Sequence, residues 1–262
     1  MNGILREITD NTAERVKVSK ERIPLGDMRR LAFSMDSNTG FPFEKALSRE
    51  GISFICECKR ASPSRGLIMQ EYPYLEIAKE YESAGASCIS VLTEPRFFLG
   101  HDDHLREVSK TVSIPCLRKD FTIDDYMIFE AKTLGASAVL LICSILDTED
   151  LGRSIGICDD LGMSALVEAH DTKDIMSALD AGARIIGINN RNLEDFTVDR
   201  GNSVILGDMI PDNVLFVAES GITTPEDVRM MRDAGADAVL IGETLMRSAD
   251  RKETLDRLRS LS

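Results

Sequence analysis

The sequence predicts an α/β protein, a (β/α)8 TIM barrel that carries an N-terminal helical extension. Three observations favour this fold class: the chain length, a phrase that recurs along the chain, and a regular alternation of helical and strand patterns. The 262 residues come close to the roughly 250 that a single α/β barrel commonly needs. The recurring phrase appears five times, as SAGASCISVLT, TLGASAVLLIC, DLGMSALVEAH, DAGARIIGINN and DAGADAVLIGE.

Each copy of the phrase joins the end of an amphipathic segment to the start of a β-rich run. The apolar run is typical of a strand buried on both faces, as in a parallel sheet. The glycine before it suits the left-handed residue that commonly ends a helix. This pattern predicts helix ends at Gly85, Gly135, Gly162, Gly182 and Gly235.

The first 50 residues precede the first expected strand and contain two helical patterns, ILREITDNTAERVKV and DMRRLAFSM. No linker-like stretch separates them from the rest of the chain. We therefore expect residues 1–50 to form a helical extension packed on the barrel, so that residues 1–262 make a single domain.

Eight strands are expected along the rest of the chain, separated by helical patterns such as PYLEIAKEYES, DDYMIFEAKTL and TPEDVRMMRDA. Eight parallel strands with intervening helices close naturally into a barrel. An open doubly wound sheet is the structural alternative, although no GxGxxG follows the first strand and no Walker-type loop is present. The expected strands lie near 53–59, 87–92, 114–119, 137–142, 164–168, 185–189, 214–219 and 237–241.

The charge and hydropathy of the chain exclude several classes of partner. A formal net charge of −13 argues against a nucleic-acid partner, because phosphate binding needs a basic face, but it permits a small basic pocket. No apolar run approaches the roughly 20 residues of a transmembrane helix, and no charged-then-apolar leader opens the chain. We expect a cytoplasmic protein without a membrane partner, and a monomer by default.

Cysteine and histidine give no convincing metal site. The six cysteines form no CxxC pair, and the three histidines are dispersed. Cys56 and Cys58 lie two residues apart on one expected strand, which leaves two interpretations. They could form a metal or redox pair, or they could be buried thiols that act as small hydrophobes, which is the commoner case. We expect no metal.

Charged residues lie where several expected strands end. Glu57 and Lys59 interrupt an apolar strand and, two residues apart, share one face. Lys119, Glu168 and Glu219 end three other odd-numbered strands, and alternate strands supply one layer of a barrel interior. A converging layer of carboxylates and ammonium groups can hold a general acid and a general base. For any single residue, a salt bridge that closes the barrel mouth is the alternative.

Two further charged residues, Arg118 and Asp120, lie at the end of the third expected strand, but we do not expect them in this layer, because side chains alternate in direction along a strand. Arg118 and Asp120 flank Lys119 and should therefore point away from the lumen. We expect both of them to have a structural role.

Two segments near the end of the chain suit phosphate binding by backbone N–H groups. ESGITTPEDV and IGETLMRS each follow a strand with a glycine and with residues that can open a helix. Thr224 and Pro225 suit an N-cap and a first helical position. Glu243 would repel phosphate through its side chain, but its backbone amide can donate. Ser62 and Ser64 offer hydroxyl donors, or they form an ordinary Ser-Pro turn.

The strand ends and the loops after them carry the motifs ECKRASPSRG, SVLTEPRFFLG, PCLRKDFTIDDYMIFEAKTLGASAVLLI, ALVEAHD, IIGINNRNLEDFTVD and VAESGITTPEDVRMMRDAGADAVLIGETLMRS. Taken together, these motifs closely resemble those of the indole-3-glycerol phosphate synthase family. The resemblance runs in order along all eight expected strands, and ILREI…V resembles the family's extra helix. It implies a metal-free lyase of tryptophan biosynthesis that needs no cofactor.

The resemblance also implies a reaction and catalytic roles. The substrate is 1-(2-carboxyphenylamino)-1-deoxyribulose 5-phosphate, and the products are indole-3-glycerol phosphate, carbon dioxide and water. Lys119 is the implied general acid at the C2′ carbonyl, and Glu168 moves a proton at the departing hydroxyl. Lys59 resembles the family lysine that meets the substrate carboxylate, and which lysine serves which step stays open. Glu57 and Glu219 would orient the lysines and hydrogen-bond the substrate.

The implied binding residues lie on the same strand ends and on the loops after them. Asn189, grouped with the catalytic residues, and Arg191 would fix the substrate hydroxyls and the neighbouring carboxylates. Ser220 would contact the substrate. Phe121, with Phe97 and Phe98, would enclose the anthranilate ring, although the last two could simply cap the barrel. The phosphate side would be formed by Ser62, Gly221, Gly242 and Glu243.

Two other functions are compatible with a barrel of this kind. An isomerase or Schiff-base aldolase would use Lys119 as a covalent nucleophile. That chemistry needs a neutral amine, whereas nearby carboxylates favour the ammonium form. A non-enzymatic partner subunit or ligand carrier is the other alternative, and it would have no need of the charges at the strand ends.

Overall fold

In the computed structural model, which describes residues 3–192 and 196–261, eight parallel strands close into a barrel. They follow one another around the barrel in chain order, and the first strand pairs with both the second and the last. Each expected strand is present, so the predicted fold class is confirmed. The strands are β1 (Ser53–Cys58), β4 (Cys88–Leu92), β5 (Cys116–Lys119), β6 (Ala138–Ile142), β7 (Ser164–Ala169), β8 (Ile185–Asn189), β9 (Leu215–Glu219) and β10 (Ala238–Ile241).

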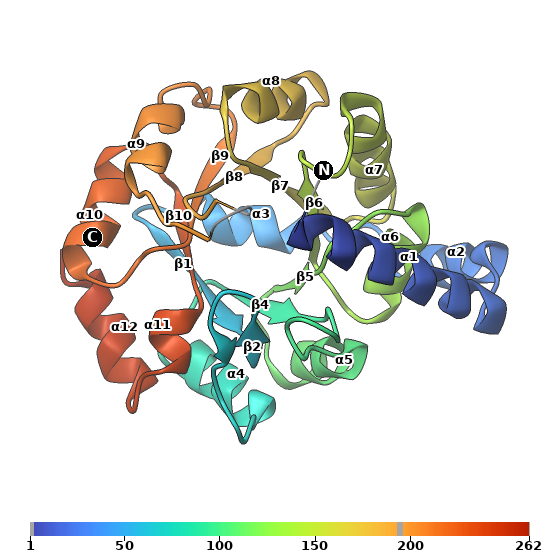
Figure 1. Ribbon diagram of the computed structural model, residues 1–262, viewed down its shortest axis with the longest axis horizontal. Helices are drawn as coiled ribbons and strands as arrows, with labels where there is room; N and C mark the ends of the chain where they lie inside the picture. The colour runs from blue at the N-terminus through green and yellow to red at the C-terminus, as the bar shows by residue number, and fades with distance from the viewer. Residues whose placement is uncertain (1–2, 193–195, 262) are drawn as a thin grey trace.

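Helices surround the barrel as an outer ring (Figure 1). The five glycines of the recurring phrase have φ between 66° and 89°, so the predicted left-handed helix ends are confirmed. The ring consists of α4 (Tyr74–Ser83), α5 (Asp102–Thr111), α6 (Asp125–Thr133), α7 (Thr148–Asp160), α8 (Thr172–Asp180), α9 (Gly201–Gly207), α10 (Pro225–Asp233), α11 (Glu243–Met246) and α12 (Arg251–Arg259).

The start of α10 shows how local sequence sets a helix boundary. The Thr224 hydroxyl accepts the N–H of Asp227, the Asp227 carboxylate accepts the N–H of Thr224, and Pro225 occupies the first turn. Such a capping box is worth about 1 kcal/mol. The N-cap predicted from TTPED is confirmed.

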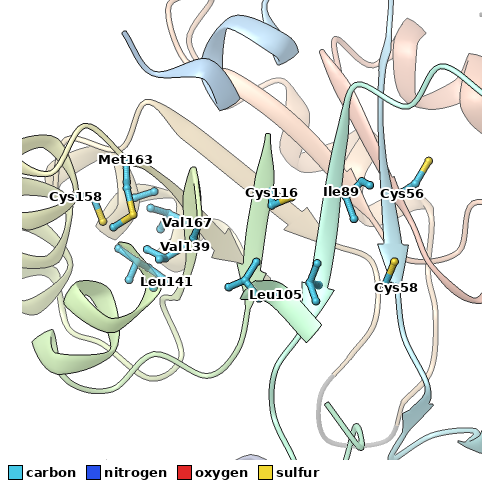
Figure 2. Packing of buried hydrophobic residues seen from close by; sticks show 14 of the residues in the cluster. Cys56, Cys58, Ile89, Leu105, Cys116, Val139, Leu141, Cys158, Met163 and Val167 are labelled. Carbon is cyan, nitrogen blue, oxygen red and sulfur yellow. The ribbon is translucent and has the colours of Figure 1, made fainter. Parts of the chain in front are cut away.

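The largest core layer lies between the strands and the helices. Figure 2 shows Cys56, Cys58 and Cys116 there among aliphatic side chains such as Ile89. Burial raises the pKa of Cys56 and of Cys116 to about 12, so both thiols stay protonated at neutral pH. Cys56 and Cys58 are free and buried, which favours the interpretation of these thiols as small hydrophobes.

The N-terminal segment reaches both ends of the barrel. It forms α1 (Ile4–Arg22), α2 (Leu25–Phe33) and α3 (Pro42–Leu47). Phe43 and Leu47 of α3 are fully buried with Leu117 and Leu166 of the barrel lumen, so α3 closes the N-terminal end. In Figure 1, α1 (dark blue) lies across the near side of the barrel, where it meets the opposite end.

The loop after β1 contains a feature that the sequence did not predict. β2 (Ala61–Ser62) and β3 (Gly66–Leu67) form a short antiparallel pair. Gly66 begins β3 with a φ of 62°, which is costly for other residues. In the described part of the chain, no helix is long and apolar enough to cross a bilayer.

Candidate active site

A cavity of about 600 Å³ opens at the C-terminal ends of the strands, where barrels place their active sites. Its wall combines strand ends, the loops that follow them, and α1. Of the site residues predicted from the sequence, the structure brings all but Phe97 into this one wall. These are Glu57, Lys59, Ser62, Lys119, Phe121, Glu168, Asn189, Arg191, Glu219, Ser220, Gly221, Gly242 and Glu243.

Lys119, at the end of β5, lies between two buried carboxylates. Its Nζ is 3.1 Å from Glu168 Oε2 on β7 and 3.3 Å from Glu219 Oε2 on β9. Burial alone would lower the pKa of Lys119, but Glu168, Glu219 and then Glu57 outweigh it and hold the pKa above its ordinary value. The side chain is therefore an ammonium group at neutral pH and can donate a proton.

The two carboxylates beside Lys119 differ in their protonation. Burial alone would raise the pKa of Glu168, but Lys119 and then His170 outweigh it, so its pKa lies below the ordinary value. For Glu219, burial together with repulsion from Glu168 exceeds the effect of Lys119 and raises the pKa to about 7. At neutral pH Glu168 is thus the ionised base of the pair, while Glu219 is near its midpoint.

Glu57 and Lys59 form a second ion pair at the end of β1. Lys59 Nζ lies 2.6 Å from Glu57 Oε1, and the carboxylate is almost fully buried. The backbone of Gly242 lies directly against this pair: a Cβ there would overlap with Glu57 Oε1 and stand 2.9 Å from Lys59 Nζ. A side chain at this position would displace one or both charged groups. The two charges on one strand thus face the cavity together.

Asn189, at the end of β8, connects the acid–base cluster to the next loop. Its side chain helps to lower the pKa of Glu168, and its Oδ1 accepts the N–H of Arg191 at 3.0 Å. The Arg191 guanidinium donates to the carbonyl of Phe196 at 3.1 Å, which places a cation on the cavity wall.

The expected phosphate side is formed by the turns after β9 and β10. Ser220 and Gly221 both have positive φ, 67° and 82°. The Glu243 carboxylate turns to Arg65 and Arg247, at 3.1 Å from each. Burial alone would raise the pKa of Glu243, but Arg247 and Arg65 hold it below its ordinary value. The acidic side chain is thus neutralised by two arginines that also line the cavity.

Aromatic and aliphatic side chains form the apolar part of the wall. The rings of Phe98 and Phe121 lie 5.8 Å apart between centroids, and both line the cavity. Phe97 instead packs against the guanidinium of Arg96, so the structure does not group it with the other two. Leu5 and Ile8 of α1 complete this side.

Arg118 and Asp120 take part in buried ion pairs, but Asp120, which we expected to point away from the lumen, also lines the cavity. Arg118 is fully buried on the outer face of β5, where it donates to the carbonyl of Met127 and to the Glu130 carboxylate. Asp120 accepts two hydrogen bonds from Arg15, at 2.9 and 2.8 Å. This bidentate pair ties α1 to the strand that carries Lys119.

Sequence reasoning missed several parts of the site. Gly187 on β8 was not singled out, yet a Cβ there would overlap with Glu219 Oε1. The contribution of α1 was also missed, as was that of Phe196, since a contact across the barrel mouth leaves no local pattern. The only available signal for Gly187 was a lone glycine inside an apolar strand, which often marks a close approach.

A family model described as Indole-3-glycerol phosphate synthase matches residues 5–258. Curated relatives match over nearly the whole chain. One from Ruminiclostridium cellulolyticum is 53% identical over 98% of each chain, and one from Lachnoclostridium phytofermentans is 49% identical over 98% of this chain and 99% of its own. Both are named indole-3-glycerol phosphate synthase. The chain belongs to the indole-3-glycerol phosphate synthase family. The resemblance seen in its motifs is thereby confirmed.

Solved structures of other proteins share the barrel alone. A 3-hexulose-6-phosphate synthase superimposes with a TM-score of 0.65 at 15% identity, covering 80% of this chain and 99% of its own. A thiamine phosphate pyrophosphorylase from Pyrococcus furiosus gives 0.61 at 15% identity over 80% and 95%. A shared barrel does not imply a shared function, so the function of this chain depends on the residues of its cavity.

Proposed function

We propose that this chain converts 1-(2-carboxyphenylamino)-1-deoxyribulose 5-phosphate into indole-3-glycerol phosphate, carbon dioxide and water. In a member of this family, the observation that carries the proposal is the Lys119 ammonium held between two carboxylates inside the cavity. Ring closure needs an acid at a carbonyl oxygen, and the later dehydration needs both an acid and a base. A charged lysine in contact with an ionised glutamate supplies both.

Lys119 acts in the first step. It donates its proton to the C2′ carbonyl oxygen while the aryl carbon that bears the carboxylate attacks C2′. The new carbon–carbon bond closes the ring, and C2′ carries a hydroxyl. The bond to the carboxylate then breaks, its electron pair restores the aromatic ring, and carbon dioxide leaves. Lys119 regains its proton from solvent, so one proton is consumed overall.

Glu168 and a lysine act in the dehydration. The C2′ hydroxyl leaves as water with a proton from an ammonium group. Because Glu168 is ionised in the resting site, it has no proton to give and accepts the one lost from C1′, which forms the indole double bond. Lys59 first meets the substrate carboxylate, and after decarboxylation it lies at the mouth as the second proton donor.

The remaining cavity residues hold the substrate. Arg191 and Asn189 fix its hydroxyls, and Ser220 adds a polar contact. Phe98 and Phe121 face the aromatic ring. Backbone N–H groups at the turns after β9 and β10, together with a serine hydroxyl, receive the phosphate. The residues assigned to the phosphate are Ser62, Gly221, Gly242 and Glu243, the last through its backbone.

A Schiff-base reaction at Lys119 is disfavoured by the same geometry. A covalent amine nucleophile must lose its proton. Glu168 and Glu219, at 3.1 and 3.3 Å, stabilise the charged form instead. The acid role for Lys119 is therefore preferred over the nucleophile role.

We further propose that residues 1–262 act as one domain, as a monomer, in the cytoplasm. The one-domain proposal is supported by α3 and α1, which contact opposite ends of the barrel, and by a family match that spans residues 5–258. The cytoplasm is where a phosphorylated biosynthetic substrate would be met.

A fluorescence assay for indole product tests the proposal. Purified full chain, without added metal, is mixed with the carboxyphenylamino substrate. We expect product to accumulate in proportion to enzyme concentration. A rate no greater than that of buffer would remove the lyase assignment.

A further inference from the structure

His170 follows β7 and has an unusual environment. Among the described residues, neither ring nitrogen finds a hydrogen-bond partner, although both are buried. The nearest charged atoms are two carboxylate oxygens: Nε2 lies 3.4 Å from Glu168 Oε1, and Nδ1 lies 3.6 Å from Asp174 Oδ2. The ring is thus held between two acids.

The two oxygens of Glu168 face different cations. Oε2 lies 3.1 Å from Lys119 Nζ, and Oε1 faces His170. In the described part of the chain, Glu168 lines the cavity and His170 does not. Any effect of His170 on a substrate must therefore pass through Glu168.

The β7–α8 connection fixes the geometry around the imidazole. The Asp174 Oδ2 atom accepts the backbone N–H of His170 at 3.0 Å. Asp171, the N-cap of α8, accepts the N–H of Asp174 at 2.9 Å. The carboxylate beside Nδ1 is therefore anchored by the first turn of a helix, and side-chain and backbone contacts hold it to His170.

Most of the charged side chains around His170 are acidic. Glu168 faces it from β7 and Asp174 from α8, while Glu219 of β9 acts on it through its charge and Lys119 of β5 lies beyond Glu168. Cys143, in the loop after β6, donates a hydrogen bond from its thiol to the backbone carbonyl of Asp174. Burial alone would lower the pKa of His170, but Asp174, Glu168 and Glu219 outweigh it and hold the pKa above its ordinary value.

We propose that His170 is a positioning residue for Glu168. The imidazole, anchored by Asp174, holds Oε1 of Glu168 so that Oε2 faces Lys119 and the cavity. When protonated, the ring also supplies a second positive charge that keeps Glu168 ionised. This inference rests on the proposed function, since Glu168 acts there as a base. Asn202 supports the arrangement by donating to the His170 carbonyl at 3.2 Å.

The test compares His170→Asn and Asp174→Asn with the unmodified chain. Loss of a neighbouring cation raises the pKa of a carboxylate, so Glu168 would become protonated at a higher pH. For His170→Asn we expect kcat to fall about tenfold and the acid limb of its pH profile to move up by about one pH unit. KM should change little. For Asp174→Asn we expect smaller changes in the same direction, both in kcat and in the acid limb of the pH profile.

His101→Asn is the matched control. This histidine is exposed and caps α5, and asparagine is also a good N-cap. Activity and pH profile should match those of the unmodified chain. Thermal unfolding of each variant shows whether it is folded.

A readout independent of turnover separates this inference from the proposed function. Carbon-13 NMR titration of glutamate carboxylates in the ligand-free protein, with Glu168→Gln used for assignment, should give a higher pKa for Glu168 in His170→Asn. An unchanged Glu168 titration would overturn the inference, even in an inactive protein. If the unmodified chain is active and His170→Asn lowers only the unfolding temperature, with kcat and pH profile intact, the inference is also overturned.

Discussion

The absent side chain of Gly187 makes room for the carboxylate of Glu219. A Cβ at Gly187 would overlap with Glu219 Oε1 and stand 3.2 Å from Leu166 Cδ1. Glu219 cannot retreat freely, because its other oxygen contacts Lys119 at 3.3 Å. One glycine on β8 thus sets the position of a charge on β9.

Gly187→Ala should therefore displace Glu219 and disturb Lys119. We expect kcat to fall by about 10- to 100-fold, since small misplacements of catalytic groups are that costly. The free energy of unfolding should fall by about 1–3 kcal/mol from overpacking. Steady-state kinetics and urea unfolding measure the two effects.

The same substitution at Gly156 is the control. Gly156 lies inside α7, and nothing stands within 4 Å of a Cβ built there. Gly156→Ala should leave kcat unchanged and stabilise the protein by about 0.5–1 kcal/mol. Normal kinetics for Gly187→Ala would show that Glu219 has room to move.

Glu219 should make stability depend on pH. Its pKa is raised to about 7 in the folded protein from an ordinary 4.5. The raised pKa means that the protonated form is favoured in the fold, so this contribution is complete below about pH 4.5 and is lost as pH rises through 7. Ionising the group in the folded protein costs on the order of 3 kcal/mol.

Glu219→Gln removes that titration. We expect its free energy of unfolding, relative to the unmodified chain, to increase between pH 5 and pH 8. Urea unfolding at several pH values measures the difference, and comparison within one pH cancels the other titrating groups. A difference that stays constant across this range would contradict the raised pKa.

Arg15 should matter for both stability and substrate binding. It donates two hydrogen bonds to the buried Asp120 and so anchors α1, whose Leu5 and Ile8 line the cavity. Arg15→Met leaves a buried carboxylate without its main partner, and we expect a loss of about 2–4 kcal/mol. KM should rise more than kcat falls, because α1 lines the cavity but contributes none of the proposed catalytic groups.

Arg6→Met is the control on the same helix. Arg6 pairs with Asp10 across one turn, and both side chains are largely exposed, so the loss should stay below about 0.5 kcal/mol. Equal effects of the two substitutions on unfolding would argue against the anchoring role of Arg15.

The strands and helix ends were predictable because their causes are local. Apolar runs such as FICEC mark buried strands, and a glycine before each of five runs marks a helix end. Glu57 and Lys59 were found because two charges in an apolar strand are costly unless they are paired or solvated. Alternation along β5 then separated Lys119 from its neighbours.

The other features of the site could not be predicted, because they depend on strand register and on contacts between residues that lie far apart in the sequence. Gly187 pairs with Glu168 on one side and Val217 on the other, a relationship that appears only once the barrel closes. The α1 helix reaches Asp120 across more than a hundred residues. Nothing in the sequence singled out His170, because its acidic neighbours come from three different elements.

The kcat of Lys119→Ala tests the central claim most directly, namely that the Lys119 ammonium is the acid of ring closure. With folding verified by circular dichroism, we expect kcat to fall by about 10²–10⁴-fold while substrate still binds. A folded variant that turns over substrate at nearly the original rate would contradict the account.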